Sequence, residues 1–166
     1  WAALLHDVGK VSIPDSILKK NGRLTDEEFK FMQTHTWRGA ALFKPITSFV
    51  DEIAVEIALR HHENWDGSGY PGFINKEKGE AERLDYATGK NQGLKGDEIP
   101  LSARIVSIAD VYDALSSRRI YKDAWEEDEV LNEIKNSSGK KFDPELVDYF
   151  FEALPNIQAI KNLFTE

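Results

Sequence analysis

The chain has 166 residues, a net charge of −8 and no cysteine. Its length suits one domain with a single sizeable core, and its 41% hydrophobic and 30% charged residues are typical of a soluble globular chain. No apolar run approaches the ~18 residues of a membrane span, and the acidic balance argues against a nucleic-acid polymer as partner. Without cysteine, disulfides and thiolate metal sites are excluded, which leaves imidazole and carboxylate groups as candidate metal ligands.

The chain opens on apolar residues, without an initiator methionine or a helix cap. This start predicts a helix that ends near Gly9, with its beginning and one or more earlier helices missing. A short helix should follow, with Asp15 as its N-cap and its end near Lys20.

One later helix start carries a capping box, formed by Thr25 and Glu28. The helix that begins there is expected to reach about Phe43. Ser48 is the candidate cap of the next helix, whose apolar positions lead to His61.

The second half of the chain predicts a glycine-rich irregular segment followed by further helices. Residues 63–100 lack a long helical period, whereas helical spacing returns from Leu101 to about Leu115. Helices are also expected over 126–138, from Pro144 to near Pro155, and over a short tail at 156–166. We find no convincing strand and no internal repeat, so the predicted fold class is all-α.

The histidine doublet His61-His62 is the first chemical signal. Adjacent residues on a helix point about 100° apart, so the two rings cannot share one narrow face. The pair suits two neighbouring metal ions, or one ion and a group that orients its ligand. A helix end with one packed and one solvated histidine explains the doublet equally well.

Three further positions carry the same ambiguity. His6-Asp7 can ligate one metal and bridge to another, or form an ion-paired helix end. Asp110 lies in an otherwise apolar helical stretch, where a metal, a buried hydrogen-bond network or plain exposure would account for its charge. His35 lies beside an apolar stripe and fits a packed core residue as well as a ligand.

Several motifs occur together and in order along the chain. They are His6-Asp7-Val8-Gly9-Lys10, His35, His61-His62-Glu63, Asp66-Gly67-Ser68-Gly69-Tyr70-Pro71, Asp110-Val111-Tyr112-Asp113-Ala114-Leu115 and Arg119-Ile120-Tyr121-Lys122. From Trp1 to about Val147, the chain resembles the HD-GYP domain, a subfamily of HD-superfamily metal phosphohydrolases linked to cyclic di-GMP. The resemblance implies a single domain over 1–166, built as a bundle of about six or seven helices with a long irregular loop after Gly-Tyr-Pro.

The resemblance also implies the roles of individual residues. The implied metal ligands are His6, Asp7, His35, His61, His62 and Asp110, with Asp7 as the bridge. They would hold two or three ions, iron or manganese first, with zinc as a further candidate. The implied catalytic residues are Asp7 and Lys10, and the implied substrate-binding residues are Lys10, Tyr70, Pro71, Asp113, Arg119 and Lys122.

The implied reaction is hydrolysis of cyclic di-GMP to pGpG, or on to GMP, by a hydroxide that bridges the metals. Two alternatives stay open: hydrolysis of another cyclic dinucleotide, and a catalytically weak module that binds a cyclic dinucleotide or a protein. The expected partners are other signalling domains, diguanylate cyclase domains among them, and the expected location is the cytoplasm.

The chain departs from the family pattern in one long segment. The family passes almost directly from Gly-Tyr-Pro to Gly-Leu-Lys-Gly, whereas residues 73–92 intervene here. The insertion has four basic and four acidic residues, which argues against an anion-binding arm. A lid, a partner contact and a solvated excursion are the alternatives, and we expect a surface loop near the pocket mouth.

Overall fold

The described part of the chain is helical. The computed structural model describes residues 2–76, 78–86, 88–89, 91–117 and 125–164. Within these ranges it contains seven α-helices and no extended strand, which confirms the all-α prediction. The α-helices are α1 (Asp15–Leu18), α2 (Asp26–Gln33), α3 (His35–Ala41), α4 (Phe49–Arg60), α5 (Leu101–Ser116), α6 (Glu127–Asn136) and α7 (Pro144–Phe164). Three short 3-10 helices are η1 (Ala2–Leu5), η2 (Val8–Ser12) and η3 (Gly96–Glu98).

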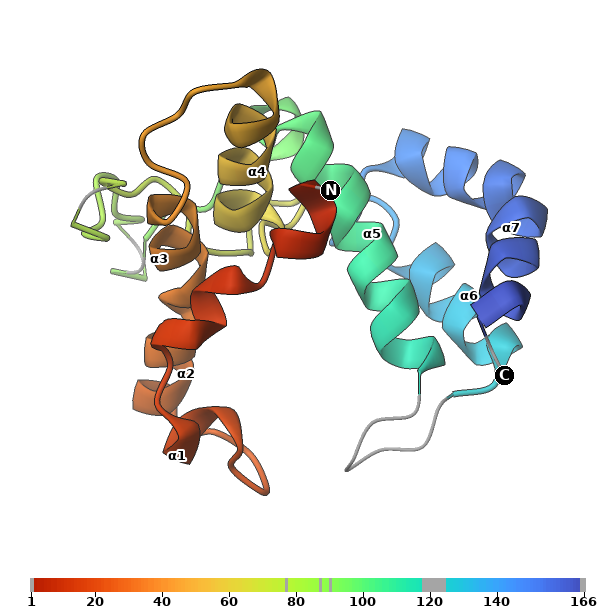
Figure 1. Ribbon diagram of the computed structural model, residues 1–166, viewed down its shortest axis with the longest axis horizontal. Coiled ribbons are helices and arrows are strands. Elements are labelled where there is room, and N and C mark those ends of the chain that lie inside the picture. The colour runs from red at the N-terminus through yellow and green to blue at the C-terminus, as the bar shows by residue number, and fades with distance from the viewer. Residues whose placement is uncertain (1, 77, 87, 90, 118–124, 165–166) are drawn as a thin grey trace.

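Helix α5 lies between two groups of helices (Figure 1), with α4 on one side and α6 and α7 on the other. α3 and η1 pack against α4, and η2 packs against α3. The largest buried apolar cluster joins α5, α6 and α7, through residues such as Tyr112, Ile134 and Phe150. A second cluster joins α3 and α4 to the segment that follows them, where Leu59 meets Ile74. The two clusters therefore flank α5.

The predicted helix starts are confirmed at α2 and α4. Thr25 accepts the Glu28 amide at 3.2 Å, and the Glu28 carboxylate accepts the Thr25 amide at 2.7 Å. Ser48 and Asp51 form the same reciprocal pair at the start of α4. Each box satisfies two amides that the first helical turn cannot.

The N-terminal expectation was wrong in detail. Instead of one helix that stops near Gly9, the chain forms η1 and then η2, which passes through Gly9. A Cβ atom on Gly9 would lie 1.9 Å from the His35 carbonyl oxygen and 2.6 Å from the Gly39 nitrogen, so only glycine allows this contact with α3. Asp15 is the first residue of α1 rather than its cap, because the Pro14 carbonyl already accepts the Leu18 amide at 2.9 Å. The Asp15 carboxylate pairs with Lys19 at 2.7 Å.

The single helix expected from Thr25 to Phe43 is broken into α2 and α3 at Thr34. The Thr34 hydroxyl donates to the Phe31 carbonyl at 2.7 Å, and His35 Nδ1 lies 2.7 Å from the Met32 carbonyl oxygen. These side chains occupy the two carbonyls that would continue the helical ladder. The break leaves His35 buried at the first position of α3.

The expected helix end near Pro155 was also wrong. Helix α7 continues through Pro155 to Phe164, so residues 156–164 extend α7 and do not form a separate tail helix. Contacts beyond the proline hold it in place, because Ile157 packs on the α5–α7 cluster and Gln158 donates to Glu127 at 3.1 Å. No helix in the described ranges combines the length and hydropathy that a bilayer span requires.

Candidate metal centre and adjoining groove

The four histidines of the chain lie close together at a partly buried point. One ligand atom from each of Asp7, His35, His61 and His62 lies within 4.8 Å of the others. His6 Nε2 adjoins this group, 3.4 Å from Asp7 Oδ2 and 3.6 Å from Asp110 Oδ1. The structure thus brings together the six residues that the resemblance implied as ligands. They come from the turn between η1 and η2, the start of α3, the end of α4 and the middle of α5.

Three of the rings are held in one orientation by the backbone. In each, Nδ1 lies within hydrogen-bond distance of a carbonyl oxygen: His6 with Ala3 at 2.8 Å, His35 with Met32 at 2.7 Å and His61 with Ile57 at 2.9 Å. A carbonyl only accepts, so these contacts place a proton on Nδ1 and turn Nε2 toward the cluster. This is the orientation that metal-binding histidines usually have.

Asp7 divides its carboxylate between two groups of histidines. Its Oδ1 lies 3.4 Å from His35 Nε2 and 3.7 Å from His61 Nε2, whereas Oδ2 faces His6 and contacts the Lys10 ammonium. Oδ1 is buried and has no hydrogen-bond partner among the described residues. A buried acceptor facing imidazole nitrogens is costly unless a cation lies between them, so the donor set fits a metal, with Asp7 placed to bridge two.

The protonation states support that reading. Burial lowers the pKa of His35, and burial together with the nearby His61 and His35 lowers the pKa of His62 to about 2. Burial alone would raise the pKa of Asp7, but contacts with His6, His61 and Lys10 hold it well below its usual range. Hydrogen bonds to Asp110 and Asp7 raise the pKa of His6 to about 10, because the two carboxylates favour a cation, a proton or a metal ion, at its Nε2 atom.

The loop after α4 places an aromatic ring on the cluster. Gly67 has a φ of +85°, and a Cβ on Gly69 would lie 2.2 Å from the Asn64 nitrogen, so the loop folds tightly onto its own start. The Tyr70 amide donates to the His62 carbonyl at 3.1 Å. As a result, the Tyr70 ring lies 4.7 Å from the His62 ring.

Glu63 fixes both ends of the segment that follows this loop, a role that the sequence analysis did not assign. Its buried carboxylate accepts the Gly72 amide at 2.7 Å, the Leu94 amide at 3.1 Å and the Arg60 guanidinium at 3.0 Å. The signal in the sequence was a carboxylate directly after an apolar helix end. Its partners lie up to 31 residues away, so their identity could not be read locally.

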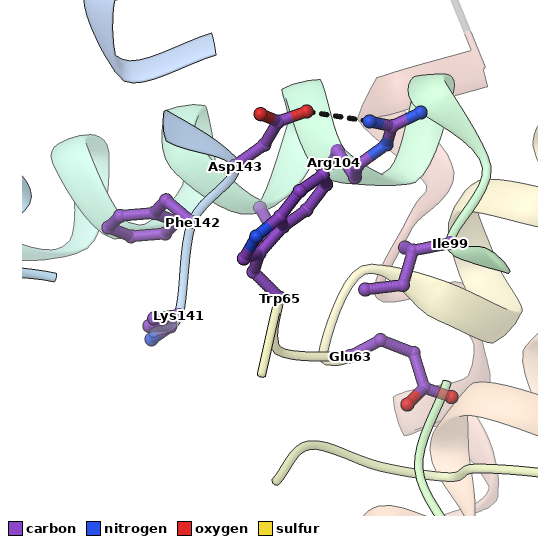
Figure 2. A pocket seen from close by; sticks show the side chains of 8 residues that line it. Glu63, Trp65, Ile99, Arg104, Lys141, Phe142 and Asp143 are labelled. Carbon is purple, nitrogen blue, oxygen red and sulfur yellow. Dashed lines mark hydrogen bonds and ion pairs between the residues drawn. The ribbon is translucent and has the colours of Figure 1, made fainter. Parts of the chain in front are cut away.

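Helix α5 and the turn between α6 and α7 support the loop from the other side (Figure 2). The Trp65 amide donates to the Lys141 carbonyl at 3.1 Å. Arg104, on α5, lies over the Trp65 ring and donates to Asp143, just before α7, at 2.6 Å. Residues far apart in the sequence thus hold the loop in place against the metal cluster.

A groove of about 1250 Å³ opens beside His62. Tyr70 and Pro71, two of the substrate-binding residues that the resemblance implied, line this groove. The groove also receives two basic residues that the sequence analysis missed, Lys30 from α2 and Lys141. Nothing in their local sequence indicated which way these lysines point. Burial lowers the pKa of Lys141, although the nearby Asp110 opposes the shift.

The other predicted substrate contacts have different positions. Lys10 touches Asp7 at the metal cluster. Asp113 is exposed on α5, one turn beyond Asp110, where it accepts the Ser117 hydroxyl at 3.2 Å. Arg119 and Lys122 lie outside the described residues.

An all-α fold that gathers four histidines and two aspartates at one point defines a helical metal-site protein. Comparison with protein families gives the particular family. The chain matches the HD domain over residues 1–81 and 79–146, so it belongs to the HD domain family. The two matched stretches meet inside 73–92, the segment that we interpreted as an insertion. The resemblance to the HD-GYP type is confirmed by the relatives.

Three of the similar curated proteins are bacterial phosphodiesterases. A cyclic di-GMP phosphodiesterase of Thermotoga maritima is 43% identical over 92% of this chain and 36% of its own length. A cyclic di-GMP phosphodiesterase response regulator of Xanthomonas campestris is 40% identical over 99% of this chain and 38% of its own length. A 3'3'-cGAMP-specific phosphodiesterase of Vibrio cholerae is 41% identical over 96% of this chain and 27% of its own length. The chain therefore spans well under half the length of these relatives.

Proposed function

We propose that this chain is a metal-dependent phosphodiesterase domain that hydrolyses cyclic di-GMP to pGpG, or on to GMP. The observation that carries the proposal is the buried Asp7 Oδ1, which has no hydrogen-bond partner among the described residues and faces the Nε2 atoms of His35 and His61. The groove beside His62 and the names of the relatives support it. Two or three bound ions, iron or manganese, would lower the pKa of water and polarise the phosphodiester.

The other residues of the proposed site have separate roles. His35, His61 and His62 surround one end of the Asp7 carboxylate, and His6 and Asp110 lie at the other end. Lys10 orients Asp7 and offers a positive charge close to a phosphate held at the cluster. From the family resemblance, we also assign substrate contacts to Pro71, Asp113, Arg119 and Lys122.

Tyr70 presents a ring directly beside His62, which gives a base a face on which to stack. We further infer that the chain works with other signalling domains, diguanylate cyclase domains among them, in the cytoplasm. One similar protein is named as a response regulator, and this similarity supports the link to signalling.

The test combines metal content with turnover. We would load the protein with iron(II) or manganese(II) without oxygen, count the bound ions and follow cyclic di-GMP by chromatography. Asp7→Ala and His35→Ala should lose metal and more than about a hundredfold of turnover. Asp97→Ala, an exposed carboxylate outside the cluster, is the matched control and should retain both. Full turnover in a folded Asp7→Ala protein would refute the metal assignment.

A second candidate function is hydrolysis of another cyclic dinucleotide. The similarity to a 3'3'-cGAMP-specific phosphodiesterase favours it. Parallel measurements of kcat/KM with cyclic di-GMP and 3'3'-cGAMP would separate the two substrates. Binding of either nucleotide to the metal-loaded protein with no product would instead favour a receptor.

A further inference from the structure

The inserted segment 73–92 is built from two small hairpins of the same design. In the first hairpin, Ile74 pairs with Ala81; in the second, Leu84 pairs with Asn91. Ten residues apart, Asn75 and Asp85 each close a turn: the Gly79 amide donates to Asn75 O, Lys78 N to Asn75 Oδ1, the Gly89 amide to Asp85 O and Thr88 N to Asp85 Oδ1.

Both ends of the insertion are bonded to the loop that carries Tyr70. The Phe73 amide donates to the Gln92 carbonyl at 2.9 Å, which closes the base of the insertion. Asn91 Nδ2 donates to the Pro71 carbonyl at 2.5 Å. Glu63 binds the neighbouring amides on either side, as described above. The hairpins therefore share one frame with the Gly-Tyr-Pro loop and with His62.

One side of the first hairpin rests on the helices. Ile74 is buried in the α3–α4 cluster, against which Trp37 also packs. Gly79 lies so close to the Trp37 ring that a Cβ atom there would come within 2.4 Å of it. These contacts hold the insertion against α3.

The hairpins also form part of the wall of the groove. Ala81, Leu84 and Thr88 line the same hollow that His62 and Tyr70 line beside the metal cluster, and Phe29 of α2 lines it as well. Small-molecule sites usually have volumes of about 300–1,000 Å³. The groove, at about 1250 Å³, exceeds that range and leaves room beyond a phosphate held at the cluster.

We propose that the insertion 73–92 is a specificity wall: it contacts the nucleotide of the substrate that lies away from the metals and helps to select its base. The exposed side chains of Leu84 and Phe29 offer apolar surface for a base. The balanced charge of the insertion suits contact with a base better than with a phosphate. This inference rests on the proposed cyclic-dinucleotide function and deepens it.

The test separates the groove wall from the metal centre. Leu84→Ala removes apolar surface from the groove, whereas Tyr86→Ala, in the same hairpin, removes a fully exposed ring that is not among the described groove-lining residues. We expect Leu84→Ala to raise KM for cyclic di-GMP about five- to tenfold with little change in kcat, and Tyr86→Ala to change neither. Bis(p-nitrophenyl) phosphate carries no nucleotide, so its hydrolysis depends only on the proposed metal site. Its turnover should stay within about twofold of the wild-type value in both variants.

A shortened chain gives a second measure. Because Phe73 and Gln92 are already hydrogen-bonded, residues 74–91 can be replaced by two glycines. The version that replaces only residues 75–90 keeps Ile74 in the α3–α4 cluster and Asn91 on the Pro71 carbonyl, and it is the one to measure. We expect it to lose more than about tenfold in kcat/KM for cyclic di-GMP, to change its preference over 3'3'-cGAMP, and to retain metal content and bis(p-nitrophenyl) phosphate turnover. Equal loss on both esters with the metal retained would overturn the specificity wall, because the insertion would then act on the metal centre.

Direct binding of cyclic di-GMP to the same proteins distinguishes failure of this inference from failure of the proposed function. Binding without turnover, weakened in Leu84→Ala, would contradict the phosphodiesterase and support the wall. Turnover with unchanged KM and binding in Leu84→Ala and the shortened chain would support the phosphodiesterase and refute the wall. No binding to the metal-loaded protein would refute both.

Discussion

Arg104 contacts two carboxylates that differ in exposure. Its guanidinium lies 2.6 Å from Asp143, whose side chain is 6% exposed, and 3.1 Å from Asp97, whose side chain is 90% exposed. Water screens the second pair but not the first, and removal of one partner of a buried pair leaves the other charge uncompensated. Asp143 also caps α7 by accepting the Glu145 amide at 3.0 Å.

We therefore predict that Asp143→Ala lowers the free energy of unfolding by about 3 kcal/mol or more, and Asp97→Ala by less than about 0.5 kcal/mol. Asp143→Asn keeps a side-chain oxygen that can accept the Glu145 amide. Its loss of unfolding free energy should therefore lie between the losses of the two alanine variants. Urea unfolding followed by circular dichroism measures all three. Equal effects of the two alanine substitutions would contradict the role of burial.

At the same scale, the sequence grouped the candidate metal ligands that the structure brings together, but it did not reveal the residues that hold them in place. Taken one at a time, each of these positions had several interpretations: His61-His62, His6-Asp7 and Asp110. The order of the motifs along the chain indicated that they form one site. Glu63 was different, because its function depends on where Leu94 returns to it. Such long-range contacts have no periodic signature in the chain.

Among the elements, the contact between η2 and α3 determines where Asp7 lies relative to His35. Gly9 meets the α3 backbone so closely that a Cβ atom would overlap the His35 carbonyl, whereas a Cβ on Gly39 would lie 3.0 Å from the Gly9 nitrogen. Gly9→Ala must therefore push η2 away from α3.

We predict that Gly9→Ala lowers the free energy of unfolding by about 3 kcal/mol and reduces metal affinity, because it separates Asp7 from His35. Gly39→Ala should cost less, since the overlap is smaller and alanine favours a helix over glycine by about 1 kcal/mol. Thermal unfolding and metal titration would compare the two variants. A Gly9→Ala protein with normal stability and metal content would show that this contact does not position the site.

Helix α7 carries a proline in its interior and another at its first position. Pro155 removes one ladder bond, and tertiary contacts beyond it, such as that of Ile157, hold the helix together. Pro155→Ala should therefore raise the free energy of unfolding by about 1–3 kcal/mol. Pro144→Ala, at a position where proline suits a helix, should change it by less than about 0.5 kcal/mol or lower it slightly. Calorimetry of both variants checks the difference.

Helix starts were easier to predict than helix ends or breaks. The boxes at Thr25 and Ser48 depend on residues three positions apart, so the local sequence contains the whole interaction. The break at Thr34 and the continuation through Pro155 depend on competing side-chain bonds and on packing against other helices. Propensity alone gave the wrong answer at both places because tertiary contacts outweigh it.

In the whole molecule, the proposed metal site lies where several elements that pack against one another meet. Its ligands come from the turn between η1 and η2, from α3, from α4 and from α5, and α5 is also the helix on which α6 and α7 pack. The long insertion lies within the irregular segment between α4 and α5 (Figure 1). The sequence located this insertion, but its hairpins and its place in the groove wall depend on contacts with α3 that only the structure shows.

A metal that binds the folded chain and not the unfolded one stabilises the fold by mass action. At a free metal concentration of 100 times Kd, the free energy of unfolding should rise by about 2.7 kcal/mol. For a chain of this size, that corresponds to an increase in Tm of roughly 5–10 °C. We predict this increase on addition of manganese(II) and its reversal by a chelator, measured by calorimetry at a fixed protein concentration.

The His35→Ala variant identifies the source of this stabilisation. His35 lies in the centre of the cluster, so its removal should abolish most of the metal-dependent increase in Tm. Lys19→Ala, a change of an exposed residue directly after α1, should retain the full increase. An equal increase in wild type and His35→Ala would mean that manganese stabilises the chain through carboxylates outside the cluster, in a chain whose net charge is −8. In that case the metal centre assigned to Asp7 and the histidines would be refuted, because a cation held there must couple its binding to the presence of His35.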